Sequence, residues 1–236
     1  MRAIILAAGM GTRLRPLTDE RPKGLVEVLG KPIVERQIEF LKEKGIHDII
    51  VVTGYLRDHY DYLVEKYGVS LIHNDKYDVY NNIYTMYVVK DYLPGSYVVE
   101  SDFFWTTNII DPNPVGSKCF CNLRENFTNE WIIRFNEESH RITEFEIGDG
   151  QNEYILSGIS YWTEEDGKFI VEKLEQEIES GNFKELYWDE MVKRHLGDMH
   201  VELVPLSSTD TYEIDSVEDL KFAESNIVEQ KKRVSI

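Results

Sequence analysis

The first hundred residues alternate between short apolar runs and segments of helical periodicity, and this alternation is the strongest constraint on the fold. Four apolar runs predict buried strands, at residues 3–8, 49–53, 69–72 and 97–100. Three segments with apolar positions on one helical face predict helices, over residues 32–45, 56–67 and 83–89. Strands that alternate with helices form parallel sheets with right-handed crossovers. The sequence therefore predicts an α/β fold with a mostly parallel sheet, crossover helices, and a ligand crevice at the carboxyl ends of the strands.

The second half of the chain has a different pattern of apolar residues. From about residue 119 to 162, alternating segments such as 131–135 and 155–161 predict antiparallel strands that are added over the site. Further predicted elements are two helices, a last strand and a closing helix, at residues 164–179, 188–195, 201–204 and 217–227. The basic tail 230–233 is predicted to be a solvated end. Because no repeat or long linker interrupts the pattern, we expect one domain over 1–236, with a core (1–110) and an elaboration that includes the closing helix (111–236).

An acidic composition limits the classes of partner. The chain has 26 Lys and Arg residues against 43 Asp and Glu residues, a net charge of −17. Such a surface repels nucleic acid and anionic membranes unless basic residues cluster, so we expect neither as a partner. The apolar runs are too short to span a membrane and the N-terminus is too short for a signal peptide, which predicts a cytoplasmic protein. Cys119 and Cys121, two residues apart on a predicted strand, are expected to be reduced packing residues.

A glycine-rich turn directly follows the first predicted strand. Gly9 and Gly11 would let backbone N–H groups approach a phosphate chain, and the cations of Arg13 and Lys23 follow within the same loop. The turn is not a dinucleotide fingerprint, because Leu14 stands where a third glycine is expected, and it does not have the residue order of a P-loop. We therefore predict a polyphosphate site, with a plain strand-to-helix turn as the alternative.

The residues from Leu6 to Lys23, with 31–35 and 52–55, resemble the sugar-phosphate nucleotidyltransferase superfamily. The resemblance implies a Rossmann-like fold in which residues 1–110 bind a nucleoside triphosphate. It also implies that Arg13 steadies the leaving pyrophosphate and that Lys23 contacts the reacting phosphates. The nucleotide-binding residues implied in this way are Leu6, Ala8, Gly9, Met10, Gly11, Thr12, Arg13, Lys23, Gly54 and Asn82. The implied catalytic residues are Arg13, Lys23 and Asp102.

Two acidic residues are candidates for a metal site. Asp102 closes the strand predicted near 97–100, so its carboxylate is expected to point into the crevice. Mg²⁺, the expected cofactor, takes few protein carboxylates, and we predict Asp215 as the second. Asp215 or Ser216 could instead cap the closing helix, with Glu218 completing a capping box if Asp215 is the cap. Whether Glu213 also ligates the metal stays open.

Motifs in the second half narrow the resemblance. Sugar-1-phosphate members usually carry a Glu-Lys-Pro segment and a Trp-x-Asp-x-Gly-Thr segment, and this chain has neither. Five segments instead resemble bacterial CTP:phosphocholine cytidylyltransferases, at residues 80–82, 128–131, 156–159, 186–189 and 212–216. The resemblance implies that residues 111–236 bind the alcohol phosphate. It implies Mg²⁺-dependent transfer of CMP from CTP to phosphocholine, with CDP-choline and pyrophosphate as products.

The choline group has a distinctive recognition chemistry. A quaternary ammonium has no N–H donor, so aromatic faces and negative charge must hold it. Trp131, Tyr187 and Asp189 have this chemistry and are the predicted substrate-binding residues, with ordinary packing as the alternative. Trp188 is adjacent to Tyr187 and cannot share its helical face, which predicts a core position. Alternative substrates are another amino-alcohol phosphate, an aminophosphonate or a sugar phosphate, and the alternative to an enzyme is a non-catalytic nucleotide sensor.

Overall fold

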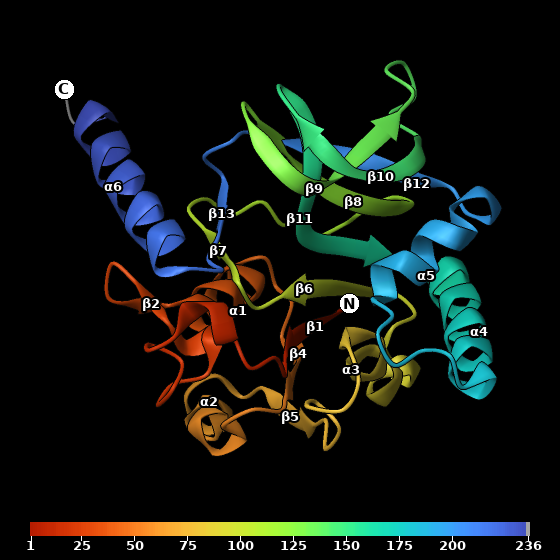
Figure 1. Cartoon of the computed structure of the whole chain (residues 1–236), viewed down its shortest axis with the longest axis horizontal. Coiled ribbons are helices and arrows are strands. Elements are labelled where there is room, and N and C mark those ends of the chain that lie inside the picture. Colours follow the sequence, from red (N-terminus) through yellow and green to blue (C-terminus); the bar gives the residue numbers. More distant parts are fainter. Residues whose placement is uncertain (235–236) are drawn as a thin grey trace.

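The computed structural model describes residues 1–234 and contains, within them, a nine-stranded mixed sheet (Figure 1). Four of its strands are parallel, in the order β5-β4-β1-β6. They are β1 (Arg2–Ala7), β4 (Asp48–Thr53), β5 (Ser70–His73) and β6 (Ser96–Glu100). The chain runs outward from β1 to β5 and returns to β6 on the other side of β1. This reversal creates a crevice at the carboxyl ends of β1 and β6, as the sequence predicts.

Helices connect the parallel strands. They are α1 (Ile33–Glu43), α2 (Tyr62–Tyr67) and α3 (Asn82–Val88). The prediction of a continuous helix over 56–67 is wrong. Leu56 has a left-handed conformation with φ 48°, and a 3-10 turn over Arg57–Tyr60 precedes α2. A left-handed residue cannot belong to a right-handed helix, so the helical segment starts after Leu56.

The antiparallel elaboration continues the sheet beyond β6 (Figure 1). Its strands are β8 (Ser117–Arg124), β9 (Phe127–Phe135), β10 (Ile142–Gly150), β11 (Glu153–Trp162) and β12 (Val201–Leu206). Strand β11 pairs antiparallel with β6 and so joins the two halves into one sheet. Strand β12 is an exception, because it pairs parallel to β8. Two short antiparallel pairs lie beside this sheet: β2 (Glu27–Val28) with β3 (Lys31–Pro32), and β7 (Phe103–Trp105) with β13 (Thr211–Glu213).

The C-terminal part is mostly helical. Its helices are α4 (Glu164–Ser180), α5 (Trp188–His195) and α6 (Val217–Val234). The predicted end of the closing helix at residue 227 is wrong, and the basic tail 230–233 is helical. No glycine or proline follows Ile227 that would end the helix. Lys231, Lys232 and Arg233 are exposed, as predicted, whereas Gln230 is half-buried and its Nε2 donates a hydrogen bond to the hydroxyl of Tyr212 at 3.0 Å.

Apolar side chains fill both faces of the sheet. One cluster lies between the sheet and helices α3, α4 and α5, and a second lies between the sheet and helices α1 and α2. Cys119 and Cys121 are buried in the first cluster and free, which confirms that they are reduced packing residues. A third cluster, which includes Leu14, Ile33 and Ile227, holds α6 against β2 and β13. Across residues 1–234, the helices are all too short or too polar to cross a bilayer.

Glu35 joins helices α1 and α2. Its carboxylate is 6% exposed and accepts hydrogen bonds from the hydroxyls of Tyr62 and Tyr67 and from the ammonium groups of Lys31 and Lys66. Burial alone would raise the pKa of Glu35, but these hydrogen bonds outweigh burial and lower the pKa to about 2. The ionised carboxylate therefore stabilises the folded chain.

We expect Glu35→Gln to lower the free energy of unfolding by about 2–3 kcal/mol at neutral pH. Because the folded pKa lies below the ordinary value of 4.5, the wild type has this stabilisation above that pH and loses it as the pH falls towards 2. Urea unfolding of both proteins at several pH values between 7 and 3 measures the difference, which should shrink with acidification. A difference that stays constant with pH would contradict this role of the carboxylate.

Candidate active site

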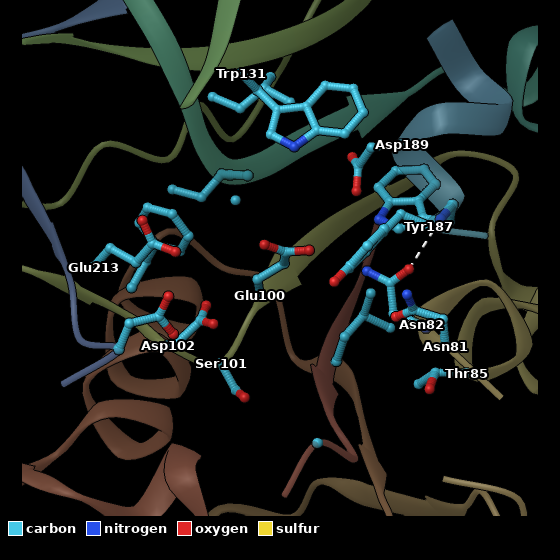
Figure 2. A pocket seen from close by; sticks show the side chains of 18 of the residues that line it. Asn81, Asn82, Thr85, Glu100, Ser101, Asp102, Trp131, Tyr187, Asp189 and Glu213 are labelled. Atoms are coloured by element: carbon cyan, nitrogen blue, oxygen red, sulfur yellow. Dashed lines mark hydrogen bonds between the residues drawn. The ribbon is translucent and has the colours of Figure 1, made fainter. Parts of the chain in front are cut away.

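A cavity of about 870 Å³ opens at the carboxyl ends of β1 and β6. The glycine-rich turn lines one part of it, and β11, β9 and the start of α5 line the rest (Figure 2). The structure places nearly all predicted site residues on its wall: Leu6, Ala8, Gly9, Met10, Gly11, Thr12, Arg13, Lys23, Asn82, Asp102, Trp131, Tyr187, Asp189 and Asp215. Segments from both halves of the chain therefore meet in one site.

Gly54 is the exception among the predicted residues, because it lies outside the cavity lining as the structure describes it. A Cβ atom on Gly54 would lie 2.6 Å from the carbonyl oxygen of Ala8 and 2.7 Å from Cβ of Tyr77. Glycine thus lets the end of β4 pack directly against the backbone that follows β1. Gly54 therefore packs against the residue that precedes the glycine-rich turn and does not line the cavity. This position does not favour the predicted contact with the nucleotide.

The glycines of the turn have different structural roles. Gly11 has a left-handed conformation with φ +60°, and its Cα packs against the side chains of Thr18 and Lys23. Gly24 is enclosed even more tightly, since a Cβ there would lie 2.7 Å from Cγ2 of Val34 and 3.1 Å from Cβ of Ser101. Gly9, in contrast, has open space around it. Gly11 therefore lets the loop pack on itself and Gly24 lets it approach α1 and the end of β6, whereas Gly9 leaves backbone open towards the cavity.

Lys23 is the centre of an ion-pair cluster. Its Nζ atom donates to Oδ2 of Asp102 at 2.7 Å and also to Oδ1 of Asp215. The guanidinium of Arg13 pairs with the other oxygen of Asp215 at 2.5 Å. Burial opposes the charge of Lys23, but the two carboxylates outweigh burial and raise its pKa. Lys23 therefore stays protonated and links three segments that are far apart in the sequence.

Asp102, Glu213 and Asp215 form an acidic group that could hold a cation. One carboxylate oxygen from each lies within 4.8 Å of the others. Within residues 1–234, Oδ1 of Asp102 is buried without a hydrogen-bond partner. Burial, followed by the charges of Asp102 and Asp215, raises the pKa of Glu213 to about 8. An unpartnered oxygen and an excess of negative charge both fit a divalent cation with oxygen ligands.

The short pair β7–β13 positions this acidic group. Glu213 pairs with Phe103 in the sheet register, and the backbone N–H of Ile214 donates to the carbonyl of Asp102 at 2.9 Å. This pairing places Glu213 and Asp215 next to Asp102. The sequence left Glu213 open as a ligand, and the structure brings it into the group.

Ser216 caps helix α6, and this leaves Asp215 available to the site. The hydroxyl of Ser216 accepts from the backbone N–H of Asp219 at 3.1 Å. The carboxylate of Asp219 accepts in turn from the N–H of Ser216 at 2.8 Å. This reciprocal arrangement is a capping box in which Asp219, rather than Glu218, is the acidic partner. The alternative in which Asp215 is merely a cap is therefore wrong.

Aromatic and acidic side chains line the other end of the cavity (Figure 2). Trp131 comes from β9, and Tyr187 and Asp189 come from the start of α5. Burial and then the charge of Glu190 raise the pKa of Asp189 to about 7. Trp188 is 3% exposed and packs edge-on against Trp162 at 6.0 Å between ring centroids. The prediction that Trp188 is a core residue is confirmed, although its edge also borders the cavity.

Several cavity residues were missed by sequence reasoning: Asn81, Thr85, Glu100, Glu130 and Glu190. Glu100 is the most informative of them, because Figure 2 shows it between the acidic group and the aromatic end. Burial first, and then the charges of Asp189 and Asp102, raise its pKa well above the ordinary value. Its spacing of two residues from Asp102, at the end of a strand, was a signal that both face the same side.

Known proteins are similar to this chain in sequence. Residues 2–72, which include the glycine-rich turn, match the nucleotidyl transferase family. The choline-phosphate cytidylyltransferase of Streptococcus pneumoniae is 46% identical over 221 residues, which cover 94% of this chain and 96% of the relative. The chain belongs to the choline-phosphate cytidylyltransferase family.

The similarity extends to three dimensions. A solved structure of CTP:phosphocholine cytidylyltransferase from S. pneumoniae superposes with a TM-score of 0.93 at 45% identity, covering 96% of this chain and 98% of that one. The family also has a relative with another substrate. The 2-aminoethylphosphonate cytidylyltransferase of Lancefieldella rimae is 32% identical over 92% of this chain and 89% of its own. The fold and the nucleotidyltransferase class are thus shown.

We expect Gly24→Ala to destabilise this cytidylyltransferase family member by about 1–3 kcal/mol, because the new methyl group would overlap Val34. Gly9→Ala is the matched control, since its methyl group would meet no atom within 4 Å, and its stability should change by no more than about 0.5 kcal/mol. Thermal unfolding of both variants measures the contrast. Equal melting temperatures for the two variants would contradict the tight approach of the loop to β6.

Proposed function

We propose that this protein transfers CMP from CTP to phosphocholine in a Mg²⁺-dependent reaction that yields CDP-choline and pyrophosphate. One observation carries the proposal. A single cavity has a glycine-rich turn with two cations at one end, three carboxylates beside them, and an aromatic, acidic pocket at the other end. Membership of the choline-phosphate cytidylyltransferase family supports the same activity.

The glycine-rich turn would bind the triphosphate of CTP. Backbone N–H groups near Gly9 can approach phosphate oxygens because Gly9 has no neighbour within 4 Å of its Cβ position. Arg13 and Lys23 would supply the positive charge, with Arg13 steadying the leaving pyrophosphate and Lys23 the reacting phosphate. In the structure these two cations pair with carboxylates, so phosphate oxygens would replace carboxylate oxygens as their partners.

Asp102 and Asp215 would hold Mg²⁺, and the position of Glu213 supports it as a third ligand. A bound Mg²⁺ ion supplies positive charge beside the transferring phosphate and its leaving group. The carboxylates of this chain contribute by fixing the position of that charge at the ends of β6 and β13. Their mutual repulsion, which adds to the effect of burial in raising the pKa of Glu213, favours binding of a divalent cation.

The chemical step needs little from the protein beyond position and charge. An oxygen of the phosphocholine phosphate would form a new bond to the α-phosphorus of CTP, and the bond to the β-phosphate would break to release pyrophosphate. The attacking oxygen is already ionised at neutral pH, so no general base is required. The cavity walls would hold the two phosphates in line and exclude water from the reacting atoms.

Trp131, Tyr187 and Asp189 would bind the trimethylammonium group. Two ring faces and a carboxylate at one end of the cavity match a cation that offers no N–H donor. The second candidate is 2-aminoethylphosphonate, the substrate in the name of the L. rimae relative. Asp189 and Glu100 are acceptors that a primary ammonium could use, so this alternative has a structural basis. A purely nucleotide-sensing role has less support, because it would not need the cations, the three carboxylates and the alcohol pocket together.

A pyrophosphate-release assay over a panel of acceptors tests the proposed function. With CTP and Mg²⁺, we expect phosphocholine to be turned over with a higher kcat/KM than phosphoethanolamine, 2-aminoethylphosphonate or a sugar 1-phosphate. A preference for 2-aminoethylphosphonate would instead support the second candidate. Intact CTP binding without turnover of any acceptor would support a sensor.

We expect Asp102→Asn to lower kcat by roughly 10²–10³-fold while the protein stays folded, because removal of a metal-binding carboxylate costs about 3–4 kcal/mol in the transition state. Asp58→Asn is the control, since Asp58 is 84% exposed and lies outside the cavity. Steady-state kinetics across a Mg²⁺ titration, with circular dichroism to verify folding, measures the effect. Wild-type kcat for Asp102→Asn at saturating Mg²⁺ would exclude the metal role.

We expect Trp131→Ala and Tyr187→Ala each to raise KM for phosphocholine about five- to thirtyfold, since a desolvated cation–π face contributes roughly 1–2 kcal/mol. KM for CTP should hardly change, because both residues lie at the far end of the cavity. Tyr92→Ala, which removes a partly exposed ring outside the cavity, is the control. If KM for phosphocholine stays the same in both variants, the proposed binding of the trimethylammonium group by Trp131 and Tyr187 is wrong.

A further inference from the structure

The start of helix α5 is held by residues of a different helix. Three hydrogen bonds connect Asn81 and Asn82, at the start of α3, to the segment 184–188. The N–H of Trp188 donates to Oδ1 of Asn82 at 2.9 Å (Figure 2). The backbone N–H of Asn81 donates to the carbonyl of Lys184 at 2.9 Å, and its Nδ2 donates to the carbonyl of Glu185 at 3.1 Å.

The local sequence explains why α5 needs an outside partner. The first N–H groups of a helix have no partner within the helix, and a Ser, Thr, Asp or Asn side chain at the N-cap usually accepts from them. The N-cap of α5 is Tyr187, whose hydroxyl is at the far end of its ring. Asn82, from α3, supplies the missing acceptor to Trp188, and Glu190 accepts from the N–H of Tyr187 at 2.9 Å.

The segment held in this way carries the proposed alcohol site. Tyr187 is its last residue before α5, and Asp189 is in the first turn of the helix. The side chain of Tyr187 is 50% exposed, so few side-chain contacts hold its ring, whereas its neighbours Leu186 and Trp188 are buried. The hydrogen bonds of Asn81 and Asn82 are the polar contacts that connect this segment to α3, so they contribute to the position of Tyr187 and Asp189 in the cavity.

We propose that Asn81 and Asn82 are positioning residues for the phosphorylated alcohol: they fix the start of α5, so that Tyr187 and Asp189 face the cavity. This inference rests on the proposed function, because it places the alcohol at these two residues. It adds a second role to Asn82, whose side-chain carbonyl faces Trp188 while its amide nitrogen lies on the cavity side (Figure 2). One side chain then contacts both the predicted nucleotide site and the helix that carries the alcohol site.

Apolar contacts keep the segment attached when these hydrogen bonds are removed. The ring of Phe183 lies 4.8 Å from that of Tyr80, centroid to centroid, and Leu186 and Trp188 are buried in the core. Variants of Asn81 and Asn82 are therefore expected to fold, with a looser start of α5.

Amide hydrogen exchange without substrate tests the restraint directly. In Asn82→Ala, exchange in the peptide that contains Trp188 should become at least about tenfold faster than in the wild type. Asn82→Asp is the matched control, because it loses the same amide nitrogen but keeps an acceptor for the Trp188 N–H, and its exchange should stay close to wild type. Unchanged exchange in Asn82→Ala, or equal acceleration in both variants, would overturn the proposal.

Kinetics then test the positioning role, with the acceptor that the wild type turns over fastest in the panel. Asn81→Asp removes the donor to Glu185 but keeps the Oδ1 acceptor that caps α3 through the N–H of Asn82. It should raise KM for the acceptor at least about fivefold and leave KM for CTP within about twofold, a split that general loss of structure would not produce. The double variant Asn81→Asp, Asn82→Ala should raise KM for the acceptor by less than the product of the single effects, because both act on one segment.

An unchanged KM for the acceptor in Asn81→Asp, or equal increases in both KM values, would overturn the positioning role. Failure of the proposed function has a different signature. A wild type that turns over no acceptor would contradict the proposed function, whereas the exchange comparison would still decide whether Asn82 restrains α5.

Discussion

The ion pairs of Lys23 with Asp102 and Asp215 are the interaction on which the rest of the site depends. Three carboxylates gather at the ends of β6 and β13, and their mutual repulsion would oppose folding if no cation stood between them. Lys23 and Arg13 supply that charge from a loop that precedes Asp215 by about two hundred residues. The close approach of Gly24 to Ser101 and the pairing of β7 with β13 both serve to bring these charges together.

The charges of Lys23, Arg13 and the three carboxylates also fit the binding of CTP and Mg²⁺ in the proposed reaction. Cations that neutralise carboxylates in the structure can instead neutralise a triphosphate, and carboxylates that lose their cation can bind Mg²⁺. The proposed pocket for the alcohol is built differently, from a strand of the antiparallel elaboration and the start of α5. Strand β11, which pairs with β6, joins the two ends within one sheet.

Sequence periodicity predicted the parallel half of the sheet, because buried strands and amphipathic helices have distinct apolar spacings. The β1–β6 crevice and the position of Asp102 followed from that topology. The strands β7 and β13 were missed because three residues are too few to show a period. The nucleotide contact of Gly54 stays a prediction, because a motif cannot distinguish a glycine that faces a cavity from one that packs against a neighbouring strand end. The bond from Trp188 to Asn82 depends on a tertiary contact over 106 positions, which no local pattern reveals.

The central claim is that Lys23 and Arg13 exchange carboxylates for phosphates when Mg²⁺ and CTP bind together. Isothermal titration calorimetry of Mg²⁺ binding, with and without CTP, tests this most directly. The account predicts weak binding of Mg²⁺ alone, because Lys23 already pairs with two of its ligands, and at least about tenfold tighter binding in the presence of CTP. Tight binding of Mg²⁺ alone, with an affinity that CTP does not change, would contradict it.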